Sequence, residues 1–131
     1  EFSYVSIIGA SISVFLGIVM TQSGFDKLFN WEGELDFITG KFAKTPLANF
    51  STFGLIQVTI FEILSGLLSI FGSIMALFYN EYSYAIMGLI LAASSLAILM
   101  LGQRISKDYE GAAVLVPYYI LTMFGLYVYV S

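Results

Sequence analysis

The chain has 131 residues, of which 59% are hydrophobic and only 11% are charged. Soluble domains usually carry roughly 25% charged residues, so this chain lacks the charge to cover a water-facing surface. We therefore expect lipid to be the solvent for much of it. The net charge of −4 comes with no basic patch of the kind that nucleic acid requires, and no nucleic-acid partner is expected.

Cysteine and histidine are both absent from the 131 residues. Their absence excludes disulfides, thiol–disulfide exchange, metal sites built from these residues, and histidine ligation of haem within this sequence. It also removes the side chain that most often titrates near neutral pH. Any proton chemistry therefore falls to carboxylates, lysine or tyrosine.

Four segments are long and apolar enough to cross a membrane as helices, which takes about 20 residues each. In chain order they are residues 2–23, 53–79, 82–103 and 113–130. Asn80 and Glu81 form a tight turn between the second and third spans, which predicts an antiparallel hairpin. The sequence thus predicts a single all-α membrane domain over residues 1–131, built as a four-transmembrane-helix bundle.

The connection between the first and second spans, residues 24–52, is amphipathic rather than a plain linker. Its apolar residues follow helical spacing, with Leu35, Ile38 and Phe42 as one set. We expect an extension of the first span, then a short amphipathic helix lying in the membrane interface, interrupted at Pro46.

Three acidic residues in this connection, Glu32, Glu34 and Asp36, alternate along the chain. Such a pattern resembles a site for a hard cation. A hydrated loop face is the favoured interpretation, and no metal site is predicted.

The basic residues predict the orientation. All five lie in the first and third connections: Lys27, Lys41, Lys44, Arg104 and Lys107. Since cytoplasmic connections of membrane proteins are enriched in lysine and arginine, both connections are expected in the cytoplasm, and the outer ends of the first and fourth spans outside.

Each of the first three spans carries its small and polar residues on one helical stripe. Gly24 and Lys27 share the stripe of the first span, Glu62 and Gly66 that of the second, and Gly88 that of the third. Small residues let helices approach closely in lipid. The stripes are therefore expected to face inward, with the large apolar side chains toward lipid.

Glu62 is a carboxylate on the inward stripe of the second span, roughly 14 Å from the basic side. An isolated carboxylate at such depth costs a few kcal/mol at least, so Glu62 must either stay protonated or have a cation beside it. Lys27 and Arg104 end spans on the same side and have long stems. The predicted polar cluster joins Lys27, Arg104 and Gln103 to Glu62, with the hydroxyl of Tyr118 or Tyr119 in the fourth span as a further candidate.

Two interpretations of this cluster stay open. In the structural one, the ion pair fixes the register of the bundle. In the functional one, carboxylate and cation line a cavity for a polar head group or a proton, since an ionisable residue inside a membrane is by default a functional candidate.

Three stretches resemble the DoxX family of small four-helix bacterial membrane proteins. They are "LGIVMTQSGFDKLFNW" (residues 16–31), "FEILSGLLSIFG" (61–72) and "LGQRISKDYEGAA" (101–113). The last, with the aromatic span after it, is similar to DoxX-like proteins of Bacteroidetes-type bacteria. The resemblance implies Lys27 and Glu62 as a polar pair, and Gly24, Gly66 and Gly72 as helix-packing positions.

The resemblance also implies a multi-pass protein of the bacterial inner (cytoplasmic) membrane. Namesakes of the family are associated with thiosulfate:quinone oxidoreductase. The leading expectation is an accessory or structural subunit that docks onto other membrane-protein subunits, without enzymatic activity of its own. The alternative is a quinone-linked oxidoreductase subunit whose pocket around Glu62 and Lys27 binds the quinone head group, with Tyr118 and Tyr119 as ligand contacts. Because the chain has no redox cysteine or haem ligand of its own, a partner or the quinone would supply the redox group. A proton path or small transporter is the weaker third option.

Overall fold

The computed structural model describes residues 3–131. Within them the chain is entirely helical apart from short connections. The helices are α1 (Tyr4–Phe29), α2 (Trp31–Phe42), the 3₁₀ turn η1 (Ala48–Phe50), α3 (Ser51–Tyr79), α4 (Ser83–Ile105) and α5 (Tyr109–Val130). Four segments, α1, η1 together with α3, α4 and α5, are long and apolar enough to cross a membrane. The predicted fold class is confirmed: this is an all-α, multi-pass membrane protein.

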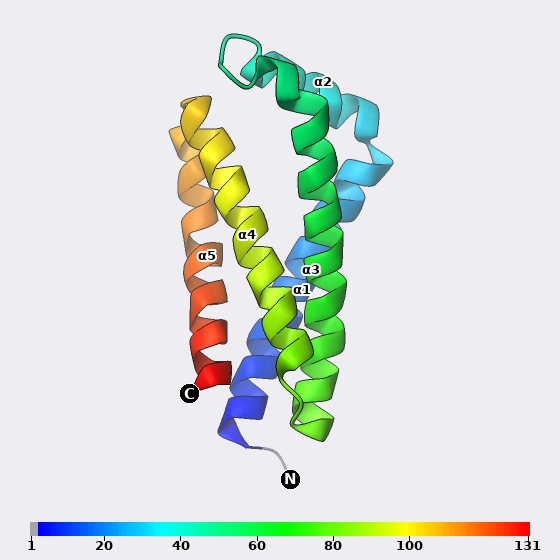
Figure 1. Ribbon diagram of the computed structural model, residues 1–131, viewed down its shortest axis with the longest axis vertical. Helices are drawn as coiled ribbons and strands as arrows, with labels where there is room; N and C mark the ends of the chain where they lie inside the picture. Colours follow the sequence, from blue (N-terminus) through cyan, green and yellow to red (C-terminus); the bar gives the residue numbers. More distant parts are fainter. Residues whose placement is uncertain (1–2) are drawn as a thin grey trace.

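The four long helices run along the long axis of the molecule, and α2 lies across one end of them (Figure 1). α3 is central, because it packs most extensively against both α1 and α4. α5 packs against α4 and α1 and completes the bundle. The predicted interfacial helix between the first and second spans is therefore present as α2.

Local capping explains where the helices begin and end. The Ser3 side chain accepts a hydrogen bond from the Ser6 N–H at the start of α1, and Asp108 accepts one from Gly111 N–H at the start of α5. Asn80 takes the left-handed conformation (φ 54°) that ends α3 before the turn. Because Asp108 is the cap, α5 begins four residues before the predicted 113. The first residue of the predicted span 2–23 lies outside the described residues.

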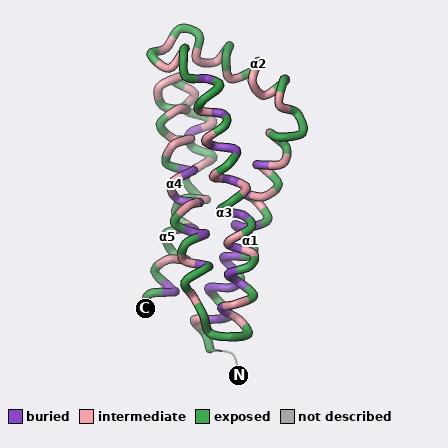
Figure 2. Tube along the Cα trace, turned by 45° about the vertical axis from the view of Figure 1, so that its right-hand side comes forward, coloured by how far each residue is buried: buried purple, intermediate pink, exposed green. Residues whose placement is uncertain are grey.

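The buried face of the bundle is made mostly of small residues. Buried positions line the facing sides of α1 and α3, whereas α2 is intermediate or exposed along its whole length (Figure 2). Large side chains such as Phe15, Phe71 and Phe124 are each about half exposed on the outer surface. This inside-out distribution matches a bundle whose solvent is lipid.

The four predicted packing glycines lie at close helix contacts. A Cβ atom on Gly66 would meet the backbone of Thr21 in α1, and one on Gly72 would collide with the backbone of Ala85 in α4. A Cβ on Gly88 would lie 2.6 Å from the backbone nitrogen of Ser69, and one on Gly24 would lie 2.5 Å from Ile63. Any larger residue at these positions would force the helices apart.

At the end of the bundle opposite α2, hydroxyl groups hold α1 against the α3–α4 turn. Ser6 Oγ donates to Asn80 Oδ1 at 2.7 Å and lies 2.9 Å from the Tyr82 hydroxyl. About two helical turns further in, the Ser13 and Tyr129 hydroxyls lie 2.7 Å apart. These contacts fix the position of the start of α1 in the bundle. They thereby help to set the register of α1 against α3 at the other end.

Candidate functional site

Lys27 and Glu62 form an ion pair inside the bundle. Lys27 Nζ lies 3.0 Å from Glu62 Oε1, and the two side chains are 17% and 2% exposed. Ser23 Oγ donates to Glu62 Oε2 at 2.7 Å, and Lys27 Nζ donates to Ser23 Oγ at 3.0 Å. The three groups form a closed cluster in which the carboxylate is held by two residues of α1.

The local sequence of α1 creates this cluster. Ser23 and Lys27 are four residues apart and so occupy the same face of the helix. Gly24, between them, lets the α1 backbone approach α3: a Cβ on it would lie 3.3 Å from Glu62 Cβ. Ser23 was not among the predicted site residues, although its spacing from Lys27 is the signal that points to it.

Arg104 and Gln103 do not belong to this cluster, which corrects the prediction. The Arg104 guanidinium lies over the Tyr109 ring, 4.6 Å from its centroid. The contacts between α3 and α4 explain why: Gly72 lies against Ala85, and Gly88 against Ser69. Continuing this register brings Glu62 level with residue 95, so Arg104 lies nine residues further along, roughly 13 Å away.

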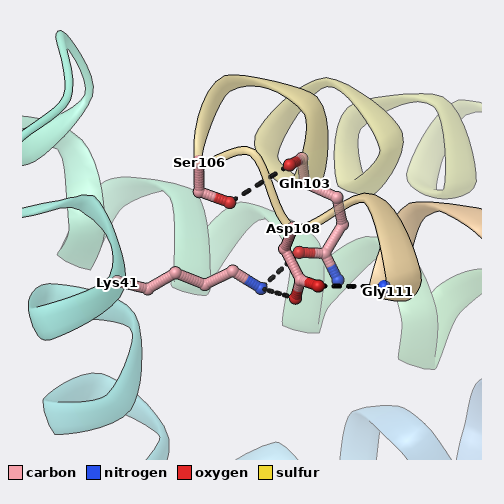
Figure 3. Close-up of polar contacts among 5 residues, drawn as sticks. All are labelled: Lys41, Gln103, Ser106, Asp108 and Gly111. Carbon is pink, nitrogen blue, oxygen red and sulfur yellow. Dashed lines mark hydrogen bonds and ion pairs between the residues drawn. The ribbon is translucent and has the colours of Figure 1, made fainter.

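A second polar cluster ties α2 to the α4–α5 loop (Figure 3). Lys41 of α2 donates to Asp108 Oδ2 at 2.8 Å and also to Gln103 Oε1. Asp108 Oδ1 accepts the Gly111 N–H at 2.9 Å, and Ser106 Oγ donates to the Gln103 backbone carbonyl at 3.2 Å. The hydrogen bond from Lys41 is the main reason that the pKa of Asp108 lies below its usual value.

A pocket of about 520 Å³ lies beneath α2, between this helix, the start of α3 and the end of α4. Its walls are largely apolar, with Phe37, Ile38 and Phe42 contributed by α2. Lys27, Lys41 and Gln103 also line it, but Glu62 does not. Lys27 therefore connects the buried carboxylate to the pocket.

The charges around the pocket are nearly balanced. Lys27 is neutralised by Glu62 and Lys41 by Asp108, and these are the two ion pairs among residues 3–131. Glu34 is the remaining charged residue of the lining. The lining consequently offers no uncompensated positive charge to an anion.

Tyr118 and Tyr119, the predicted ligand contacts of the fourth span, do not line this pocket. Tyr118 packs against the buried cluster that includes Leu16 and Leu89. Tyr119 lines a separate apolar pocket of about 240 Å³ between α4 and α5. The prediction that these tyrosines meet the head group of a ligand beside Lys27 does not fit this arrangement.

Comparisons with known proteins add no assignment. No family model, curated protein or solved structure matches the chain. Within residues 3–131, acidic side chains also form no group arranged to hold a metal ion. The function must therefore be argued from the site itself.

Proposed function

We propose that the chain is a DoxX-like protein of the bacterial inner membrane that holds an uncharged amphiphile of the quinone type in the pocket beneath α2. It serves there as a membrane subunit of a larger complex. The observation that carries this proposal is the pocket itself, with Lys27 in its wall and the charge of that lysine already neutralised by Glu62.

The size and lining of the pocket support this class of ligand. A volume of about 520 Å³ falls in the range of small-molecule sites, which are mostly apolar with a few placed polar groups. Apolar side chains of α2, α3 and α4 suit a hydrocarbon ring or tail. Lipid-borne ligands of this kind reach such a site from the bilayer.

The hydrogen-bonding capacity of Lys27 supports an oxygen-bearing head group. An ammonium group has three N–H donors. One faces Glu62 Oε1 and one binds Ser23 Oγ, which leaves one donor for an acceptor in the pocket. A quinone carbonyl is such an acceptor, and Gln57 and Gln103 of the lining add amide groups.

The charge balance argues for a neutral head group over an anionic one. An anionic phospholipid would meet lysines that already have partners and would also face Glu34. A neutral carbonyl group can bind without changing this charge balance. The redox groups of any electron transfer would come from a partner, since the 131 residues contain no cysteine or histidine.

The test is whether quinone binds in this pocket. Protein purified from native membranes is extracted, and the quinone content is measured by chromatography. Gly54 lines the pocket, and a Cβ on it would meet nothing within 4 Å, so the side chain of Gly54→Leu has room to start into the pocket and should displace the quinone. Gly40→Leu is the matched control, because Gly40 has the same open surroundings but does not line the pocket.

Two results would reject the proposal: a wild-type protein without quinone, or equal quinone in the two glycine variants.

The second candidate is a purely structural accessory subunit. The mutual pairing of Lys27 with Glu62 favours it, because both charges are satisfied within the chain. Co-purification of a stable partner with quinone-free protein would support that role.

A further inference from the structure

The contacts of α2 point to a gate: we infer that α2 is a movable lid on one side of the partly open pocket and that the Lys41–Asp108–Gln103 contact is the latch that holds it in place. This deepens the proposed function, because it concerns access to the same pocket, and it rests on that function for its biological meaning. The movement itself can be measured without any ligand.

The first argument is that α2 covers the pocket without being part of the core. Five of its residues line the cavity: Glu34, Phe37, Ile38, Lys41 and Phe42. Yet none of its twelve residues is buried. Displacing α2 would therefore widen the opening of the cavity without disrupting the packing of the four long helices.

The second argument is that both ends of α2 can act as joints. A single residue, Asn30, separates α1 from α2, with φ −119° and ψ 45° and no side-chain cap on α2. At the other end, the chain leaves helical geometry after Phe42 and passes Pro46 before α3 begins. Such short non-helical segments are where hinge motions are absorbed.

The third argument is that the latch joins a mobile side to a fixed one. Asp108 caps α5 through its hydrogen bond to Gly111 N–H, so its position is set by the bundle. Lys41 reaches it from α2 at 2.8 Å. The side chains of Lys41 and Asp108 are 16% and 38% exposed. Because the Asp108 carboxylate is more than a third exposed, solvent and salt weaken this ion pair, which suits a contact that must open and close.

Lys41 and Lys44 provide a matched comparison within one segment. Lys41 holds the latch, whereas Lys44 is exposed and neither lines the pocket nor forms an ion pair in the described part of the chain. Removing the charge of Lys41 should free the lid, whereas removing that of Lys44 should not.

The experiment measures access to the pocket wall with a thiol reagent. The chain contains no cysteine, so a single Ser51→Cys substitution gives one reactive group at a buried, pocket-lining position. Its rate of reaction with a maleimide is followed in nanodiscs. Thr52→Cys, at the exposed neighbour that does not line the pocket, reports the intrinsic reactivity of a thiol at this depth.

We expect Lys41→Met and Asp108→Asn each to raise the Ser51→Cys rate about fivefold, the factor for the loss of one exposed ion pair. Asparagine at position 108 can still cap α5, and this position does not line the pocket. A faster reaction in Asp108→Asn would therefore come from loss of the latch, and not from damage to α5 or to the cavity wall. Combining the two changes should raise the rate no further than Lys41→Met alone, because Lys41→Met already removes the contacts with both Asp108 and Gln103. Lys44→Met should leave it unchanged.

Wild-type rates in both latch variants would overturn the inference. So would a parallel rise at Thr52→Cys, because that result would mean general loosening of the start of α3. If the expected rates are found in a protein that binds no quinone, the lid stands and the proposed ligand is wrong. The two proposals therefore fail separately.

Discussion

Removing Lys27 while leaving Glu62 in place is the perturbation that tests the centre of the bundle most directly. In Lys27→Met the carboxylate, which is 2% exposed in the wild-type structure, loses its cation and keeps Ser23 as its hydrogen-bond donor among the described residues. In Glu62→Gln, Lys27 keeps its charge and loses the carboxylate that neutralises it. Lys27 is 17% exposed and lines the pocket, so its ammonium group has a second polar environment available.

The structure gives the size of each effect. The charged atoms are 3.0 Å apart, and at an effective dielectric constant of about 20 their attraction is roughly 5 kcal/mol. Desolvation offsets part of it, and breaking a buried pair from one side typically costs about 3–5 kcal/mol. We expect a loss of about 3 kcal/mol for Lys27→Met. For Glu62→Gln we expect only about 1 kcal/mol, because the amide still accepts a hydrogen bond from Ser23.

The double variant Glu62→Leu/Lys27→Met replaces both members of the ion pair with apolar side chains. Apolar residues often replace a buried ion pair without loss, so its stability should return to within about 1 kcal/mol of the wild type. The free energy of unfolding is measured by titration with sodium dodecyl sulfate in mixed micelles, followed by far-ultraviolet circular dichroism. Equal losses in Lys27→Met and Glu62→Gln would refute the role given to the pocket, and equal stability of all variants would mean that the pair is not formed.

Three further outcomes are expected. Gly72→Ala should destabilise by about 1–3 kcal/mol, because its Cβ would collide with the backbone of α4, whereas Gly54→Ala has open space and should be neutral or gain up to about 1 kcal/mol; the reverse order in the same titration contradicts the close α3–α4 contact. Ser23→Ala removes a hydrogen bond to a carboxylate and should lose about 2 kcal/mol, and an unchanged unfolding curve argues against the bond. The lowered pKa of Asp108 means that its ion pair with Lys41 contributes fully above the usual aspartate pKa and is lost only as pH falls through the lowered value. A spin label on α2 should therefore become mobile only under more acidic conditions than a free aspartate requires, and mobility rising near pH 6 would contradict this.

The sequence was sufficient to predict the helical architecture. Lipid imposes a simple rule, since every backbone polar group in the membrane core must be paired within a helix or a closed barrel. Long apolar runs then mark the helices with little ambiguity. The amphipathic spacing of Leu35, Ile38 and Phe42 likewise predicted α2, which ends at Phe42, before Pro46.

The sequence predicted that Glu62 would pair with a cation, but it did not decide which one. Lys27 and Glu62 lie on inward stripes near the same end of their helices, so they were candidates for each other, and the structure brings them together. Arg104 was an equally reasonable candidate by sequence. Only the register of α4 against α3 decides between the two, and that register is set by contacts such as Gly88 with Ser69, which no single-helix pattern contains.

The latch and the pocket were not predictable. Lys41 lies 62 and 67 residues from Gln103 and Asp108, and nothing local in either segment indicates the other. The cavity is a property of how α2 lies over the ends of α3 and α4. A sequence pattern specifies which residues face inward, but the space left between helices depends on all of them at once.

The ion pair also has a consequence for how the protein enters the membrane. Its lysine is on α1, and its carboxylate is on α3, the next long helix along the chain. A central acidic residue raises the free energy of inserting an isolated helix by about 2.5–3.5 kcal/mol. During synthesis α3 meets α1 already in place, so its carboxylate can find Lys27 as it enters. The order of the helices in the gene thus lets the first span assist the insertion of the second.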